Sequence, residues 1–356
     1  LTLVLLGEGE AYYKGTRMSG KEAMEKAGII PAQLTSKEGL ALINGTNVMT
    51  GIGALVVYDA QQLLKSADIV GAMTLEALKG ITDAFDFKAQ KVRGQIGQQI
   101  AAKNLLRLLE GSKMTTRQGE LRVQDAYSLR CMPQIHGASR DAIEYAKNVV
   151  SIELNAATDN PLIFVDDDQV ISGGNFHGQP MAFAMDFLGI AVSELANVSE
   201  RRLERLVNPQ LNDLPAFLTK NGGLNSGFMI TQYSAASMVS ENKVLAHPAS
   251  VDSIPSSANQ EDHVSMGTTA ARKAKMILDN VQKVIGIEAF GASQAISLRG
   301  EVKLGKGTEA AYRAIREVVS PVEEDRIMYT DLVKFDNMIK DETLIKAVES
   351  AIGEID

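Results

Sequence analysis

The chain has 356 residues, which is enough for two domains or for one large helical domain. Its 36 basic and 44 acidic side chains give a net charge of −8, which argues against nucleic acid or an anionic membrane surface as the main partner. No apolar run reaches the roughly 18 residues of a transmembrane helix, and the single cysteine, Cys131, excludes an intrachain disulfide framework, so we expect a soluble protein of a reducing, cytoplasmic compartment.

The first residues, Leu1 to Gly7, are apolar and carry neither the basic leader nor the cleavage site of a signal peptide. They also lack an initiator methionine and are typical of the middle of a buried element. We therefore expect the protein to continue before Leu1.

Proline placement predicts where long helices can run, because proline removes a helix hydrogen bond and clashes with the preceding turn. Proline-free stretches span residues 32–132, 181–208, 216–247 and 256–320. Capping residues and apolar spacing predict helices over 40–64, 88–109, 137–158, 179–207, 225–245 and 263–298, and two shorter helices after Gly300, the first over 308–318. The one convincing strand signal is a short hairpin over 162–171.

These elements predict an all-α fold with one short β-hairpin. We expect a single mainly helical domain over residues 1–356, with shorter peripheral helices over 300–356. The helix predicted over 179–207 is apolar nearly all round in its first half, which is typical of a helix buried inside a bundle. Long helices with apolar seams on more than one face usually pack against other subunits, so a homo-oligomer is expected.

Several common kinds of site are missing from the sequence. Gly7-Glu8-Gly9 lacks the third glycine of a dinucleotide fingerprint, and no phosphate loop or nucleophile elbow occurs. The four histidines, His136, His177, His247 and His263, are not paired at metal-ligand spacing, so no metal is expected.

Gln124, Tyr127 and Arg130 stand at i, i+3 and i+6 in a loop-to-helix segment and can converge on one pocket. An arginine fork suits a substrate carboxylate, and a tyrosine hydroxyl can donate to a reacting group or exchange a proton with it. A structural arginine in an ion pair is the alternative.

Three further polar segments interrupt apolar elements. Asn44-Gly45-Thr46 breaks an apolar helix, and its asparagine either satisfies a neighbouring backbone group or faces a ligand. Two glycines precede Phe176 just before the buried helix, which a plain turn also explains. After a loop rich in Pro and Ser, a polar cluster over 259–263 opens a long helix, where the helix dipole favours the acid Glu261 and where that acid also suits a cationic or proton-donating substrate group.

Taken together and in this order, seven segments resemble the family of aromatic amino acid ammonia-lyases. The matching segments are Leu42–Thr46, Gln124–Arg130, Thr158–Leu162, Ile171–His177, Ser199–Arg202, Asn225–Phe228 and Ser257–Met266. The resemblance covers the chain up to about Gly300. It implies the long central helical bundle of the ammonia-lyase and fumarase type, assembled as a homotetramer whose active sites each take residues from three subunits.

The resemblance also implies a cofactor, 4-methylidene-imidazol-5-one, which forms by cyclisation of an Ala-Ser-Gly triplet. That triplet is absent from this sequence. In the family it lies shortly before the segment that resembles Leu1–Glu10, so we expect it upstream of Leu1, with the lid loop and the tyrosine proposed as base for the β-proton.

The resemblance assigns roles to eight residues. They are Arg130 and Asn160 at the substrate carboxylate, Asn44 and Tyr127 beside the electrophile and the amine, Gln124 in the pocket wall, Phe176 by the ring, Glu261 at the ring nitrogen, and Gln260 as a further substrate-binding residue. Among them, Tyr127, Asn44 and Glu261 are expected to be catalytic.

Glu261 indicates which amino acid is the substrate. A buried acid is favourable beside an imidazole, whereas beside a phenyl ring it is a desolvated charge without a partner. We therefore expect elimination of ammonia from L-histidine to give trans-urocanate, the first step of histidine degradation. The alternatives are a tyrosine or phenylalanine ammonia-lyase or aminomutase of the same fold, and a helical scaffold that kept the fold without the chemistry.

Overall fold

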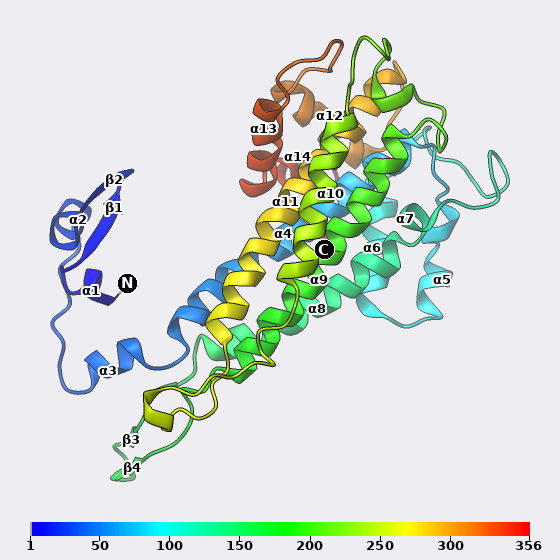
Figure 1. Cartoon of the computed structure of the whole chain (residues 1–356). Coiled ribbons are helices and arrows are strands. Elements are labelled where there is room, and N and C mark those ends of the chain that lie inside the picture. The colour runs from blue at the N-terminus through cyan, green and yellow to red at the C-terminus, as the bar shows by residue number, and fades with distance from the viewer. Residues whose placement is uncertain (1) are drawn as a thin grey trace.

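The structure, a computed structural model, describes residues 2–356, which form fourteen α-helices and two small antiparallel hairpins (Figure 1). The helices are α1 (Thr2–Leu5), α2 (Gly20–Ala27), α3 (Glu38–Ile43), α4 (Asn47–Ala77), α5 (Phe87–Lys91), α6 (Ile96–Leu108), α7 (Tyr127–Arg130), α8 (Met132–Glu153), α9 (Gln179–Val207), α10 (Met229–Leu245), α11 (Gly267–Leu298), α12 (Lys306–Val318), α13 (Tyr329–Lys340) and α14 (Thr343–Ile352). The strands are β1 (Glu10–Tyr13), β2 (Thr16–Ser19), β3 (Leu162–Phe164) and β4 (Gln169–Ile171). The predicted all-α fold is confirmed.

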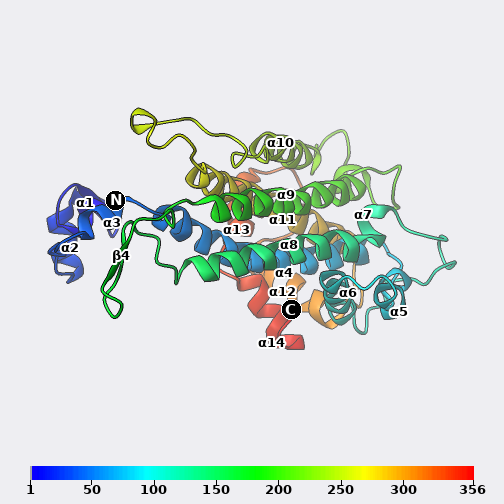
Figure 2. The same cartoon turned by 90° about the horizontal axis from the view of Figure 1, so that it is seen from below.

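The long helices α4, α8, α9 and α11 lie side by side along the bundle, with α10 on its outside (Figures 1 and 2). Helix α9 packs against α11, α8, α10 and α4, and Met185 and Leu188 on these contacts are buried. Phe183, Phe187 and Ile190 on the same helix are about half exposed, so the predicted burial on all sides is not found in this chain. In α11 the apolar side chains at spacings of three and four, Ala274, Ile277, Val281 and Val284, are also buried. The long helices pack against one another through apolar side chains, so the bundle is rigid. Side chains at the ends of these helices are therefore held in fixed positions.

Close backbone contact fixes two of the helices. At the crossing of α6 and α8, a methyl group added to Gly137 would lie 2.3 Å from the backbone nitrogen of Gln98. Only glycine fits this crossing without movement of one helix.

By length and composition, α9 is the one helix among the described residues that is long and apolar enough to cross a membrane. Most of that apolar stretch is buried inside the bundle.

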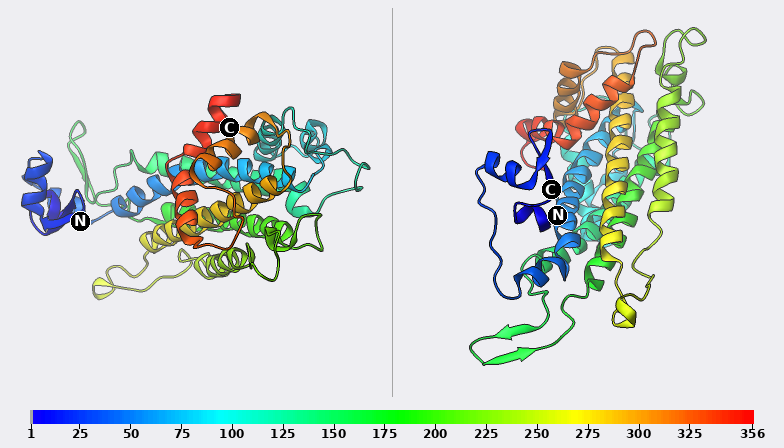
Figure 3. Two further views of the ribbon diagram at one scale, coloured as in Figure 1. Left: turned by 90° about the horizontal axis from the view of Figure 1, so that it is seen from above. Right: turned by 60° about the vertical axis from the view of Figure 1, so that its left-hand side comes forward.

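The prediction of a single hairpin is wrong, since β1 and β2 form a second one in register Glu10 to Ser19. Lys14 and Gly15 make its two-residue turn, with φ of 48° and 80° respectively. Paired positive φ values favour this kind of hairpin turn, and the lysine in the first position hides the signal. With α1 and α2 this hairpin forms a small unit to one side of the bundle (Figure 3).

The predicted burial of residues 1–7 is not found in this chain. Leu3 and Leu5 of α1 are about half exposed, and Leu1 lies outside the described residues.

Several helix boundaries also differ from the prediction. The helix expected over 88–109 is two helices, because the chain turns at Gly94 with φ of 84° between α5 and α6. Helix α8 begins at Met132 rather than 137, since Pro133 lies in its first turn, where no helix hydrogen bond is lost. Three helices, α12 to α14, follow Gly300 instead of two.

Candidate active site

One group of the predicted site residues gathers at the lower left end of the bundle in Figure 1. Asn44 follows α3, and the next residue, Gly45, has φ of 107°. A methyl group on Gly45 would lie 2.9 Å from the carbonyl oxygen of Thr158. The corner that carries Asn44 therefore rests directly on the loop that carries Asn160.

The loop around Asn160 is bonded both to Lys37, which precedes α3, and to the segment that leads to Phe176. Lys37 pairs with Asp159 at 2.8 Å, and hydrogen bonds from Lys37 hold the pKa of that carboxyl below its usual value. The side-chain oxygen of Asn160 accepts a hydrogen bond from the backbone N–H of Gly173 at 2.9 Å. The side-chain oxygen of Asn160 therefore binds the segment that leads to Phe176.

The segments that carry Phe176 and Glu261 meet above the first turn of α4. Methyl groups on Gly178 and on Gly267 would each lie 2.5 Å from the sulfur of Met49. The rings of His177 and His263, next to these segments, are stacked with centroids 5.6 Å apart and planes 8° apart. The two segments are therefore packed together.

Glu261 lies in a loop and not at a helix start, because α11 begins only at Gly267. The helix-dipole explanation for this acid is therefore wrong. Its carboxylate accepts a hydrogen bond from the hydroxyl of Ser256 at 2.8 Å, and the backbone N–H of Ser256 donates to its carbonyl oxygen at 3.1 Å. No basic side chain among residues 2–356 forms an ion pair with it. The side chain is exposed, so the burial expected of this acid is not found in this chain.

The second group lies at the opposite end of the bundle. Gln124 and Arg130 line a pocket of about 210 Å³ together with Asp83, which follows the end of α4. The guanidinium carbon of Arg130 lies 4.6 Å from the ring centroid of Tyr127, a cation–π contact. Tyr127 itself is 69% exposed, so its hydroxyl is accessible.

Arg130 is the unpaired cation of this pocket. Hydrogen bonds from Arg117 hold the pKa of Asp83 below its usual value, so that acid is ionised and already has its own cation. The Nε atom of Arg130 is buried and has no hydrogen-bond partner among the described residues. A structural ion pair, the alternative considered for this arginine, is not what the described part of the chain contains.

The eight predicted residues therefore form two groups, which we name by their place in Figure 1. The lower half-site is Asn44, Asn160, Phe176, Gln260 and Glu261, and the upper half-site is Gln124, Tyr127 and Arg130. Helix α4 separates them, and its 31 residues at about 1.5 Å each span about 46 Å (Figures 1 and 2). Within one chain the two half-sites do not meet.

Several residues that lie at these sites have no signal in the sequence that predicts their position. Asp83 lies in Thr-Asp-Ala-Phe-Asp, which has the composition of an ordinary turn and gives no signal of a pocket. The stacked pair His177 and His263 joins loops 86 residues apart in the sequence, and no spacing rule links them. Among residues 2–356, no cluster of three or more His, Cys, Asp or Glu side chains is placed to hold a metal ion.

Two side chains fit a cofactor with an electrophilic carbon and a carbonyl oxygen. Asn44 is exposed, and its amide has no hydrogen-bond partner among the described residues, so it is free to donate. The exposed hydroxyl of Tyr127 is equally free. The donor types fit the group, although they lie in different half-sites.

The long helical bundle and its two polar half-sites define the class of protein. Residues 1–317 match the family model described as aromatic amino acid lyase, so the chain belongs to the aromatic amino acid lyase family. The resemblance drawn from the seven sequence segments is thereby confirmed.

Individual relatives narrow the likeness further. The histidine ammonia-lyase of Alkaliphilus metalliredigens is 65% identical over 353 residues, which cover 99% of this chain and 70% of that protein. The histidine ammonia-lyase of Clostridium tetani is 62% identical, over 99% of this chain and 69% of that protein.

Solved structures agree in fold. Histidine ammonia-lyase from Trypanosoma cruzi has a TM-score of 0.91 and 44% identity, covering 99% of this chain and 68% of that one. Tyrosine aminomutase from Streptomyces globisporus has a TM-score of 0.94 and 36% identity, covering 100% of this chain and 72% of that one.

Proposed function

We propose that the protein eliminates ammonia from L-histidine to give trans-urocanate. The observation that carries the substrate is Glu261, an acid without a basic partner among the described residues, packed in a loop beside the segment of Phe176. An imidazole N–H donates a hydrogen bond to such a carboxylate, which a phenyl ring cannot do. The relatives named histidine ammonia-lyase, at 59–66% identity, support the same substrate.

The elimination breaks the bond between Cα and the amine nitrogen, removes one proton from Cβ and forms the Cα–Cβ double bond. Arg130 takes the substrate carboxylate through its planar fork, for which its unpartnered Nε and its place in the pocket wall are suited. Gln124 and Tyr127 line the same end, and the hydroxyl of Tyr127 exchanges a proton at the substrate amine. Phe176 packs against the substrate ring at the lower half-site.

We also propose 4-methylidene-imidazol-5-one as the cofactor, with Asn44 and Tyr127 as the residues of this chain that hold it. When bound, it supplies an electrophilic carbon that draws electrons from the substrate amine and makes it a better leaving group. Its Ala-Ser-Gly triplet does not occur in the 356 residues, and the relatives are longer than this chain, which supports a triplet in a part of the protein outside them.

The active site is shared between subunits of a homotetramer. The support is geometric: Arg130 and Glu261 lie toward opposite ends of α4, a helix about 46 Å long, whereas the carboxylate and the ring of one histidine lie within a few ångströms of each other. Chains packed against each other in opposite directions bring the upper half-site of one chain to the lower half-site of another. We place this enzyme in the cytoplasm, for which the single cysteine is the support.

The experiment is an ultraviolet spectrum recorded while the full-length protein is mixed with L-histidine, L-tyrosine or L-phenylalanine. The proposal expects the conjugated urocanate band to grow with L-histidine alone. Growth of a coumarate or cinnamate band without a urocanate band would contradict the substrate, and no band with any of the three would favour a scaffold without the chemistry. Chromatography of the same reactions would detect conversion of L-tyrosine to its β-isomer. That product would identify an aminomutase, which is what one structural neighbour with a TM-score of 0.94 is named.

A further inference from the structure

A fully buried histidine lies in the first turns of α8, two residues after Gln134 and outside both half-sites. The Nδ1 atom of His136 lies 2.7 Å from a carboxylate oxygen of Asp68 on α4. Its Nε2 atom lies 3.3 Å from a guanidinium nitrogen of Arg202 on α9. Both ring nitrogens therefore connect α8 to neighbouring rods of the bundle.

The contact with Arg202 identifies the protonation state of the ring. A guanidinium group only donates hydrogen bonds, so Nε2 accepts and the proton is on Nδ1, where it is donated to Asp68. Burial lowers the pKa of His136, which agrees with a neutral ring. In this state the imidazole is a fixed bridge with one donor and one acceptor.

The groups on both sides of the bridge are themselves held. Arg202 binds Glu288 of α11 through two nitrogens, at 2.6 and 2.8 Å, and Glu288 also accepts the hydroxyls of Thr74 and Ser199. These side chains are completely buried, so they have little freedom to move.

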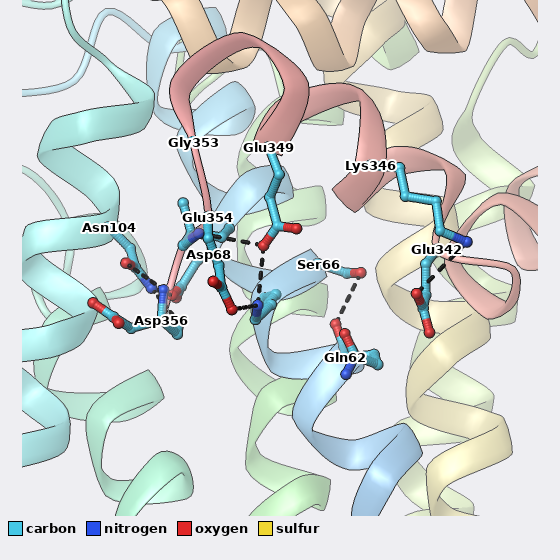
Figure 4. A network of polar contacts seen from close by, with 12 residues as sticks. Gln62, Ser66, Asp68, Asn104, Glu342, Lys346, Glu349, Gly353, Glu354 and Asp356 are labelled. Atoms are coloured by element: carbon cyan, nitrogen blue, oxygen red, sulfur yellow. Dashed lines mark hydrogen bonds and ion pairs between the residues drawn. The ribbon is translucent and has the colours of Figure 1, made fainter.

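On the other side, Asp68 accepts hydrogen bonds from Asn104 at 3.0 Å and from Arg140 at 2.9 Å. Figure 4 shows Asp68 and Asn104 beside Asp356, whose backbone oxygen accepts from both Asn104 and Arg140. Burial alone raises the pKa of Asp68, but the hydrogen bond from His136 and the charge of Arg140 outweigh it, and the net pKa is lowered. The carboxylate is thus an ionised anchor.

The bridge acts on the first turns of α8, which follow directly after the upper half-site. Helix α7 is a single turn, Tyr127 to Arg130, in which only Leu129 is buried. Cys131 alone separates it from α8, whose first residue, Met132, packs on Gly71 of α4, where an added methyl group would meet the methionine sulfur at 2.7 Å. Helix α7 therefore takes its orientation from the first turns of α8.

We propose that His136 is a positioning residue for the reaction: by linking Asp68 and Arg202 it fixes the first turns of α8 and so holds Arg130 and Tyr127 in the orientation that receives the substrate carboxylate. This inference rests on the proposed function, because it gives Arg130 its role. It predicts that the bridge matters for substrate capture more than for the chemical step.

The test replaces His136 in the full-length protein with Asn, Gln or Leu. Asn puts a donor where Nδ1 stands, Gln puts an acceptor where Nε2 stands, and Leu removes both. The matched control is Ile143→Ala, a core change on the same helix that creates a cavity and lowers stability without touching the bridge. The measurements are Tm, KM and kcat with L-histidine.

We expect His136→Leu to raise KM at least about tenfold with a smaller change in kcat, His136→Asn to restore much of the loss because it keeps the bond to the charged Asp68, and His136→Gln to restore less. Ile143→Ala should lower Tm with KM within about twofold of wild type. A KM that follows Tm alone across all four variants would overturn the inference.

A second measurement does not need turnover. In protein labelled with 3-fluorotyrosine, the ¹⁹F resonance of Tyr127, assigned through Tyr127→Phe, reports the ring on which Arg130 stacks. We expect His136→Leu to shift it and Ile143→Ala to leave it in place. An unchanged resonance in His136→Leu would refute the positioning role, whatever the activity of the variant. If the wild-type protein does not turn over L-histidine but the resonance still shifts in His136→Leu, the proposed function is refuted and the positioning of α7 by His136 stands.

Discussion

Replacing Arg130 with alanine tests the role of the upper half-site in substrate capture. The guanidinium has its Nε unpartnered and its carbon 4.6 Å from the Tyr127 ring, so it is oriented before substrate arrives. Each charge-assisted hydrogen bond to a carboxylate contributes about 1.5–3 kcal/mol, and partial exposure of the pocket favours the lower part of that range. Loss of two such bonds, about 3–4 kcal/mol, corresponds to a fall in kcat/KM of roughly 10²- to 10³-fold.

The loss should appear mainly in KM, because the carboxylate is gripped equally in the ground state and the transition state. Arg130→Lys keeps the charge without the fork and should lose about tenfold. Arg313→Ala on the exposed face of α12 is the control. It removes an arginine that pairs with Glu309 in an i, i+4 ion pair and belongs to neither half-site. Steady-state urocanate formation measures all three. An Arg130→Ala enzyme within about threefold of wild type would refute this assignment.

Other predictions concern the ring contact, the core and the pH dependence. Glu261→Gln should lower kcat/KM for L-histidine by about 10²-fold while Tm stays within about 2 °C, because the side chain is exposed; equal losses of turnover and Tm would contradict this. Arg202→Met should lower the free energy of unfolding in urea by about 3–5 kcal/mol because it leaves Glu288 charged and buried, and the added change Glu288→Gln should recover part of it. Because burial lowers the pKa of His136, the unfolded chain binds a proton below pH about 6.5 that the folded chain does not, so stability should fall with falling pH from there by up to about 1.4 kcal/mol per pH unit. The lowered pKa of Asp68 adds a further loss below about pH 4. Urea titrations from pH 8 to 4 should therefore be flatter near pH 6 for His136→Gln, and identical slopes would contradict a neutral buried ring.

Sequence signals predicted the long helices best where the apolar stretch is long. Helix α9 has the predicted bounds, Gln179 to Val207, because its long apolar stretch lies between proline at its start and proline after its end, and both signals are visible in one sequence. The absence of proline predicts one continuous helix over 88–109, whereas Gly94 turns the chain through a positive φ between α5 and α6. The start of α8 was missed for the opposite reason, since Pro133 is tolerated in a first helical turn.

The sequence predicts individual candidate residues of the site but does not predict how they are arranged. Motifs identify Asn44, Arg130 and Glu261 because each is a polar residue in an unusual local context. Their separation into two half-sites depends on how far α4 continues beyond the predicted end at residue 64, and it continues to Ala77. The buried bridge of His136 gave no signal, since a single histidine in an amphipathic helix has the same sequence pattern whether it packs in the core or binds a ligand.

The shared active site is tested most directly by mixing two inactive forms of the full-length enzyme. Arg130→Ala destroys the upper half-site and Glu261→Gln the lower one, so each homo-oligomer should have little activity. If every active site takes these two residues from different chains, random co-assembly at equal amounts should restore about a quarter of the wild-type turnover of L-histidine, because each of the two residues is intact in half of the positions. If the mixed oligomers are formed and remain as inactive as their parents, both residues belong to the same site of one chain, and the account of two half-sites at opposite ends of the bundle is wrong.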